Sequence, residues 1–234
     1  MKKETIEVLS TISKGRHRTN LLKVQEQKAL AYLVTRIPDC ISSNMLTGIG
    51  FVGSLITVMS FLLATYVDRS LLLLGVPGFF INWFGDSLDG RIAYYRQTPR
   101  KWYGFSLDIT VDWLTTILIG AAYIIYVAYS SSWGLVGFIF VVMYGWEMIT
   151  ALLRYKITDK YSIDNGLFGP TEVRIVISLI LILEVLIPDS IIYSGILACI
   201  MLFIANIIDT RKLLHMGNER DKNEKELKMK ETNA

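Results

Sequence analysis

The sequence predicts an all-α fold, an integral membrane bundle of six transmembrane helices preceded by an amphipathic juxtamembrane helix. Of the 234 residues, 52% are apolar, and they are collected in long blocks with the charged residues between them. A helix needs about 20 apolar residues to cross a bilayer, and blocks this continuous do not suit the alternating strands of a barrel. The second observation is that lysine and arginine are distributed very unevenly among the segments between the blocks.

Segment 1–43 is expected to be a cytoplasmic N-terminal region that contains the amphipathic helix. Residues 21–37 place apolar positions near helical spacing with charged residues between them, which is typical of a helix lying on the inner membrane surface. The apolar positions are Leu22, Ala29, Leu30 and Leu33. Pro38 ends this helix, because the residue before a proline disfavours helical backbone. The alternative is a cytoplasmic helix that packs on a partner.

Six apolar blocks then predict a transmembrane domain over residues 44–210. The spans are expected at 45–67, 71–89, 106–129, 132–153, 171–187 and 190–208. The fifth span is short, and Pro188 separates it from the sixth. The tail 211–234 is rich in lysine and glutamate, so we expect a solvated helix or a disordered end there, without chemistry.

Positive charge is concentrated on one side of these spans. Only Arg69 of the 24 lysines and arginines lies on the other side. The others comprise eight in 2–36, four in 91–101, four in 154–174 and seven in 211–230. The positive-inside rule therefore predicts a multi-pass cell-membrane protein with both termini and two loops in the cytoplasm.

Four aspartates form the most informative cluster of the chain. Asp86 and Asp89 lie three residues apart at the end of the second span, and Asp108 and Asp112 lie four apart at the start of the third. Each spacing puts a pair on one face of a helix. Because the connection, about 91–105, is short, we expect the two helices to be antiparallel neighbours and all four carboxylates to converge near the cytoplasmic face.

Four carboxylates at this depth repel one another unless cations balance them. The cationic candidates in these helices, Arg91 and Arg96, are on the loop side. Oxygen ligands without His or Cys select Mg²⁺, Mn²⁺ or Ca²⁺, and a pair of ions is a common arrangement in phosphoryl transfer. The two histidines, His17 and His215, lie in the polar tails, so a base in the site is a carboxylate, a Tyr or a Lys, and an aspartate is the simplest choice.

These residues resemble the CDP-alcohol phosphotransferase family, whose pattern is D-x2-D-G-x2-A-R-x8-9-G-x3-D-x3-D. Seven of its eight fixed positions match between residues 86 and 112, and the six-helix core of the family agrees with the span count. The matching residues are Asp86, Asp89, Gly90, Ala93, Gly104, Asp108 and Asp112. Tyr94 stands where the pattern has Arg, which in the family is expected near the nucleotide or its diphosphate; Arg91 or Arg96 could substitute, or Tyr94 could mark a weakened enzyme. Two weaker similarities flank the core: Ser43-Asn44-Met45-Leu46-Thr47 and Gly169-Pro170-Thr171-Glu172.

The resemblance implies a transferase that releases CMP. It implies Mg²⁺ or Mn²⁺, in two ions, held by Asp86, Asp89, Asp108 and Asp112. It implies that Asp112 is a metal ligand or, more characteristically, the base that takes the proton of the acceptor hydroxyl. Gly90 and Gly104 would let the backbone approach cytidine and diphosphate, although small residues also serve helix packing in membranes. Asn44, Thr47 and Ala93 are assigned to the same nucleotide site.

The acceptor is left open between two classes. Arg154 and Arg174, with Lys156 near the first, could bind the phosphate of an acceptor and would favour CDP-diacylglycerol as donor, or they could be membrane anchors. Glu172 could bind an ammonium headgroup, which would favour CDP-ethanolamine or CDP-choline with diacylglycerol, or it could pair with Arg174. Glu147, inside the fourth span, has no assigned role.

Three other functions compete with this one. Membrane prenyltransferases also use aspartate-rich metal sites, but with acidic motifs that are farther apart. A divalent-cation transporter would need polar residues in both halves of the membrane, and a catalytically inactive scaffold is the third. The expected partners are a CDP-alcohol lipid, a small alcohol or diacylglycerol, and membrane lipids; a homodimer is compatible with these partners, and nucleic acid is not expected.

Overall fold

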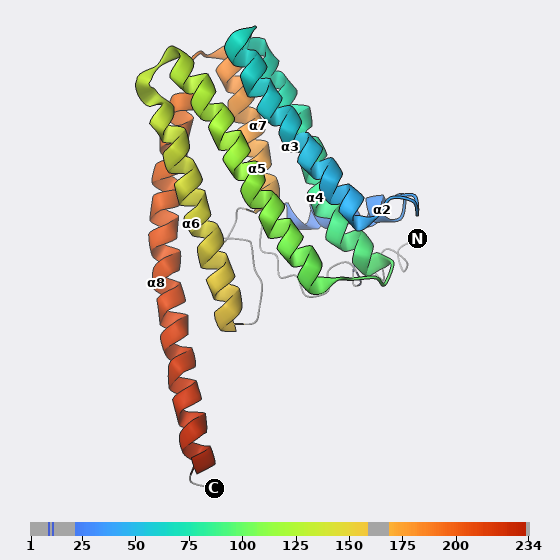
Figure 1. The fold of residues 1–234 in the computed structure, drawn as a ribbon, viewed down its shortest axis with the longest axis vertical. Helices are drawn as coiled ribbons and strands as arrows, with labels where there is room; N and C mark the ends of the chain where they lie inside the picture. Colours follow the sequence, from blue (N-terminus) through green and yellow to red (C-terminus); the bar gives the residue numbers. More distant parts are fainter. Residues whose placement is uncertain (1–8, 10, 12–21, 159–168, 233–234) are drawn as a thin grey trace.

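The computed structural model describes residues 9, 11, 22–158 and 169–232, and within these ranges the chain is helical without strands (Figure 1). The elements are α2 (Lys23–Val34), α3 (Ser43–Tyr66), η1 (Arg69–Leu74), α4 (Gly75–Tyr95), α5 (Lys101–Ser130), η2 (Ser132–Gly134), α6 (Leu135–Thr158), α7 (Pro170–Leu186) and α8 (Ser190–Thr232). The predicted all-α class is confirmed.

Five helices of the described ranges are long and apolar enough to cross a membrane, judged by length and composition. They correspond to the predicted first, second, third, fourth and sixth spans, and they indicate a multi-pass membrane protein. The predicted fifth span forms as α7, but its 17 residues rise only about 26 Å, less than the roughly 30 Å of a hydrocarbon core. The count of six spans is therefore not confirmed.

Helix α2 forms where an amphipathic helix was predicted, but it turns a partly different face inward. Leu30 and Val34 are buried, as is Glu26, whereas Ala29 is exposed. The buried side packs on Leu46 of α3 and on α4, so the position of the neighbouring helices, rather than the count of apolar residues alone, selects the inward face.

Glycines set the distance between α3 and α4, the most extensively packed pair of helices. A Cβ atom placed at Gly85 would lie 2.6 Å from the Cα of Gly50, and one at Gly78 would lie 2.8 Å from the carbonyl oxygen of Gly53. Small residues allow helix backbones in membranes to approach this closely. The contact fixes α4, and therefore Asp86, against α3.

Helices α4 and α5 are joined by a short connection and meet through their side chains. The connection spans only residues 96–100 and turns at Gln97, which has a φ of 57°. In the described ranges the backbones of both helices pack mainly on α3. The carboxylates of α4 and α5 nevertheless come together, as the short connection predicted, while the glycine contact brings α4 closer to α3 than to α5.

The end of the bundle away from the aspartates is organised by Glu184 of α7. Its buried carboxylate accepts a hydrogen bond from the backbone N–H of Ile191 at 2.9 Å and one from the hydroxyl of Tyr126 at 2.9 Å. The carboxylate thus binds the N-terminus of α8, where free N–H groups need acceptors. From there α8 continues without a break beyond the other helices to Thr232, so the predicted 210/211 boundary lies inside one helix (Figure 1).

Candidate metal centre

Three of the four predicted metal ligands meet between α4 and α5. One carboxylate oxygen each from Asp86, Asp108 and Asp112 lies within 4.8 Å of the others. Oxygens on opposite sides of one divalent ion are about 4–5 Å apart, since metal–oxygen distances are about 2.0–2.6 Å. The donor set and its spacing therefore fit a hard divalent cation.

The fourth aspartate, Asp89, does not join this group. It is buried, and its Oδ2 accepts a hydrogen bond of 2.7 Å from the hydroxyl of Thr47. Thr47 was predicted as a nucleotide-site residue, and the structure places it at the wall of the cavity, where it also holds a motif aspartate. Asp89 and Thr47 thereby connect α4 to α3 at the depth of the metal-ligand group.

A cation from α7 enters the group. The Nη2 of Arg174 lies 2.6 Å from Oδ2 of Asp86, and its Nε donates to Oδ1 of Asn82 at 2.7 Å. Arg174 was predicted to bind an acceptor, and the structure places it directly beside a predicted metal ligand, Asp86. Its charge offsets part of the repulsion among the carboxylates.

Asn82 was missed at the sequence level. Its amide nitrogen donates to the carbonyl of Gly50 at 3.1 Å and to the hydroxyl of Ser54 at 2.9 Å, while its oxygen holds Arg174. The available signal was a polar residue in an apolar span, one helical turn before Asp86. Asn82 therefore connects α3, α4 and α7 behind the carboxylates.

A small cavity lies at this point between α3, α4 and α5. Its lining consists of Thr47, Gly50, Phe51, Asn82, Asp86, Asp108, Val111 and Asp112. The cavity thus brings together the three carboxylates, Asn82 and one hydroxyl, in a wall that is otherwise apolar.

The predicted nucleotide residues lie toward the α4–α5 connection. Gly104 is exposed, and no described atom outside its own helix and chain neighbours comes within 4 Å of a Cβ placed there. Packing against the described helices therefore does not explain this glycine. Asn44 contacts the start of α5, and Gly90 and Ala93 are half-buried in α4.

The two arginines proposed for the acceptor bind different acids. Arg154 of α6 forms an ion pair of 3.2 Å with Asp209 of α8, whereas Arg174 binds Asp86. Glu147, the acid left unassigned, lies two turns before Arg154 on α6. Arg154 and Arg174 therefore do not form one site through these contacts.

Glu172 has a structural role at the start of α7. One carboxylate oxygen accepts from the N–H of Gly169 at 3.0 Å, and the other accepts from the N–H of Leu22 at 2.8 Å. Both oxygens are thus bonded to backbone, and the side chain is 6% exposed. The hypothesis that it pairs with Arg174 is not supported, because Arg174 binds Asp86 and Asn82.

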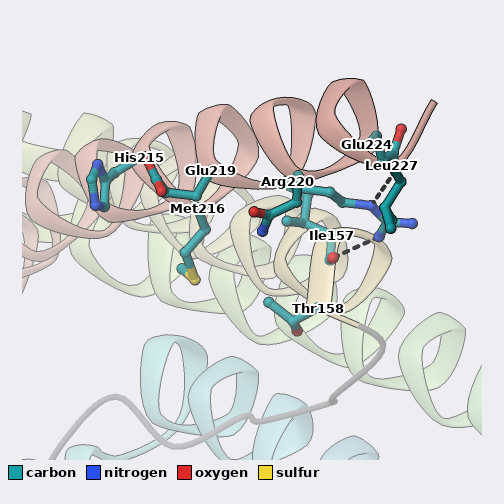
Figure 2. A pocket seen from close by; sticks show the side chains of 9 residues that line it. Ile157, Thr158, His215, Met216, Glu219, Arg220, Glu224 and Leu227 are labelled. Carbon is teal, nitrogen blue, oxygen red and sulfur yellow. Dashed lines mark hydrogen bonds and ion pairs between the residues drawn. The ribbon is translucent and has the colours of Figure 1, made fainter. Parts of the chain in front are cut away.

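A wider hollow lies elsewhere, between the end of α6 and the extended part of α8 (Figure 2). Arg220 crosses it and donates to the carbonyls of Lys156 at 3.0 Å and Ile157 at 2.6 Å. These carbonyls belong to the last described turn of α6. The hollow is thus a seam at which Arg220 ties α8 to α6, and it holds none of the clustered aspartates.

A comparison with models of protein families finds a match, and the matched range includes the clustered aspartates. The model of the CDP-alcohol phosphatidyltransferase family matches residues 41–210, a range that includes every residue of the centre. No curated protein shows significant similarity to the chain. Since the match covers well over half of the sequence and the clustered carboxylates suit phosphoryl transfer, the chain belongs to the CDP-alcohol phosphatidyltransferase family, whose members are transferases of substituted phosphate groups.

Proposed function

We propose that the protein transfers the phosphatidyl group of CDP-diacylglycerol to the hydroxyl of a phosphorylated alcohol and releases CMP. Asp86, Asp108 and Asp112 would hold magnesium or manganese, two ions in all. Asp89, which Thr47 holds beside this group, is proposed as the fourth ligand. When bound, these ions supply positive charge to the diphosphate of the donor. The observation that carries the proposal is Arg174, a cation placed directly against this ligand group.

Asp112 is the base of the proposed reaction. It lies one turn farther along α5 than Asp108 and lines the cavity. Its carboxylate takes the proton of the acceptor hydroxyl as that oxygen attacks the phosphorus next to diacylglycerol. The bond from this phosphorus to the bridging oxygen breaks, and CMP leaves with that oxygen and the bonding electron pair. A phosphodiester lipid remains.

The state of Glu172 favours an anionic acceptor over an ammonium one. Both of its carboxylate oxygens are bonded to backbone N–H groups, so the carboxylate that could have bound choline or ethanolamine is already engaged. Arg174 uses its Nε and Nη2 to bind Asn82 and Asp86, and its guanidinium has further N–H donors that suit phosphate oxygens. An acceptor such as glycerol 3-phosphate or an inositol phosphate fits this charge best.

The proposed topology has α7 as a sixth, short span, with residues 44–210 as the catalytic domain. α2, the α4–α5 connection and the end of α6 lie at one end of the bundle, which also carries most of the cations (Figure 1). The positive-inside rule places this end, the metal centre and both termini in the cytoplasm. α2 then lies on the inner membrane surface.

The test measures CMP release by the purified protein in lipid with Mg²⁺ or Mn²⁺. CDP-diacylglycerol is paired with glycerol 3-phosphate, inositol 1-phosphate, inositol or serine, and CDP-ethanolamine and CDP-choline are paired with diacylglycerol. We expect release with a phosphorylated acceptor, loss on chelation, and loss in Asp112→Asn but not in Asp221→Asn, an exposed control on α8.

Three results contradict the proposal. Release from CDP-ethanolamine or CDP-choline with diacylglycerol, and from no other pair, would favour that reaction. No CMP under any pairing, together with metal-dependent ion flux into vesicles, would favour a transporter, and no activity of either kind would favour a scaffold.

A further inference from the structure

The motif arginine is absent from this chain, and the structure shows why its two nearest neighbours do not replace it. Arg96 donates to the carbonyls of Ile41 at 2.6 Å, Pro38 at 2.9 Å and Ile37 at 3.2 Å, so it holds the segment between α2 and α3. Arg91 is 3% exposed and donates to the carbonyl of Ser87 in its own helix. Both guanidinium groups are thus occupied with structure.

A third arginine stands at the open end of the site. Arg100 immediately precedes α5, and its Nη2 donates to Oδ1 of Asn44 at 2.7 Å. Its guanidinium carbon lies 4.2 Å from the ring centre of Tyr103, whose hydroxyl accepts from the amide of Asn44 at 3.2 Å. Each of the three side chains therefore fixes the other two, and Arg100 is held in a defined position although it is exposed.

Arg100 begins the row of positions that carries two of the metal ligands. Arg100, at the N-cap of α5, and then Gly104, Asp108 and Asp112 follow one another at intervals of four residues, so each lies about 40° around the axis from the one before. Arg100 and Asp108 are about 12 Å apart along the axis at 1.5 Å per residue. Gly104 lies between them and leaves open space on this side. The surface between the guanidinium of Arg100 and the carboxylate of Asp108 is therefore open at Gly104.

We propose that Arg100 replaces the missing motif arginine and binds the nucleotide half of the CDP-alcohol, with Asn44 and Tyr103 as its positioning residues. This inference rests on the proposed function. A guanidinium has five N–H donors, so the bond to Asn44 directs the group and leaves donors for phosphate or base oxygens. The aromatic face of Tyr103 keeps the guanidinium plane oriented.

The test measures the affinity of CMP, with Mn²⁺ present, for the full-length protein in lipid. Arg100→Ala is compared with Lys101→Ala, which removes an equal charge from the next residue, one that contacts Trp102 instead. We expect CMP affinity to fall about ten- to a hundredfold in Arg100→Ala, the effect of losing charge-assisted hydrogen bonds, and less than about twofold in Lys101→Ala. Tyr94→Arg added to Arg100→Ala restores the motif and is expected to recover most of the affinity.

Two outcomes overturn the inference alone: Arg100→Ala binding CMP within twofold of the wild type, or Lys101→Ala losing as much affinity as Arg100→Ala. A wild-type protein that binds no CMP at all overturns the proposed function as well. The two failures are thus distinguished by the wild-type measurement.

Discussion

Replacing Gly85 by alanine is expected to separate α3 from α4. The added Cβ would lie 2.6 Å from the Cα of Gly50, and nearer still to the Gly50 nitrogen and the Leu46 carbonyl oxygen, all of them backbone atoms that cannot rotate away. Ordinary contact begins near 3.4 Å and the nearest of these atoms, the Gly50 nitrogen, would lie at 2.3 Å, so the helices must move apart by about 1.1 Å. Overpacking of this kind costs about 1–3 kcal/mol, which lowers the melting temperature of a chain of this size by about 2–12 °C.

The rate of CMP release by Gly85→Ala is expected to fall by a larger factor than its loss of stability alone would cause. Gly85 is followed directly by Asp86, and a misplacement of about 1 Å in a catalytic site can reduce the rate about a hundredfold. The assay combines thermal unfolding in detergent with CMP release at saturating substrate. Gly48→Ala is the matched control. It also adds one methyl group to a glycine of α3, but that methyl group meets no described atom within 4 Å.

The reasoning is refuted if Gly85→Ala unfolds within about a degree of the wild type and keeps its activity, since α3 and α4 would then not touch at this position. A Gly48→Ala protein that loses as much stability as Gly85→Ala would also refute it. In that case any added methyl group, rather than the close backbone approach, would be the cause.

Three further variants separate positioning, substrate approach and stability. Asn82→Ala removes the support of Arg174 and should shift the Mn²⁺ activation curve about tenfold upward, as loss of a residue behind metal ligands does; an unchanged curve contradicts this role. Gly104→Ala should raise the melting temperature slightly, because alanine favours helix by about 1 kcal/mol, yet raise the KM for the CDP-alcohol; an unchanged KM speaks against close substrate approach. Glu184→Ala should cost about 2–4 kcal/mol of stability through lost hydrogen bonds and leave KM unchanged; a changed KM would show coupling between the two ends of the bundle.

The site illustrates how far spacing within a helix can be followed. Asp108 and Asp112 lie on one face of α5 because four residues make about one helical turn, and the structure brings both to Asp86. Asp89, with the equally plausible spacing of three from Asp86, instead binds Thr47. Helical periodicity predicts which side chains share a face of a helix, but it does not predict which residues of other helices that face contacts.

The charged residues were the hardest to assign from sequence. Arg174 and Glu172 stand two residues apart, and either could have bound a ligand or the other. In the structure Glu172 binds backbone N–H groups at the start of α7, and Arg174 reaches Asp86. The partners are distant in the sequence, so no local pattern distinguishes these outcomes.

The helical class, the approximate ends of the helices and the pairing of aspartates on helix faces could all be predicted from the amino-acid sequence, because hydropathy and helical period act over a few neighbouring residues. Only the packed helices show that the backbones of α4 and α5 both rest mainly on α3, that α2 buries the face with Glu26, and that Asn82 and Arg174 stand behind the carboxylates. Those contacts depend on how closely glycine-bearing backbones approach across the bundle, a distance that arises only when separate helices pack together.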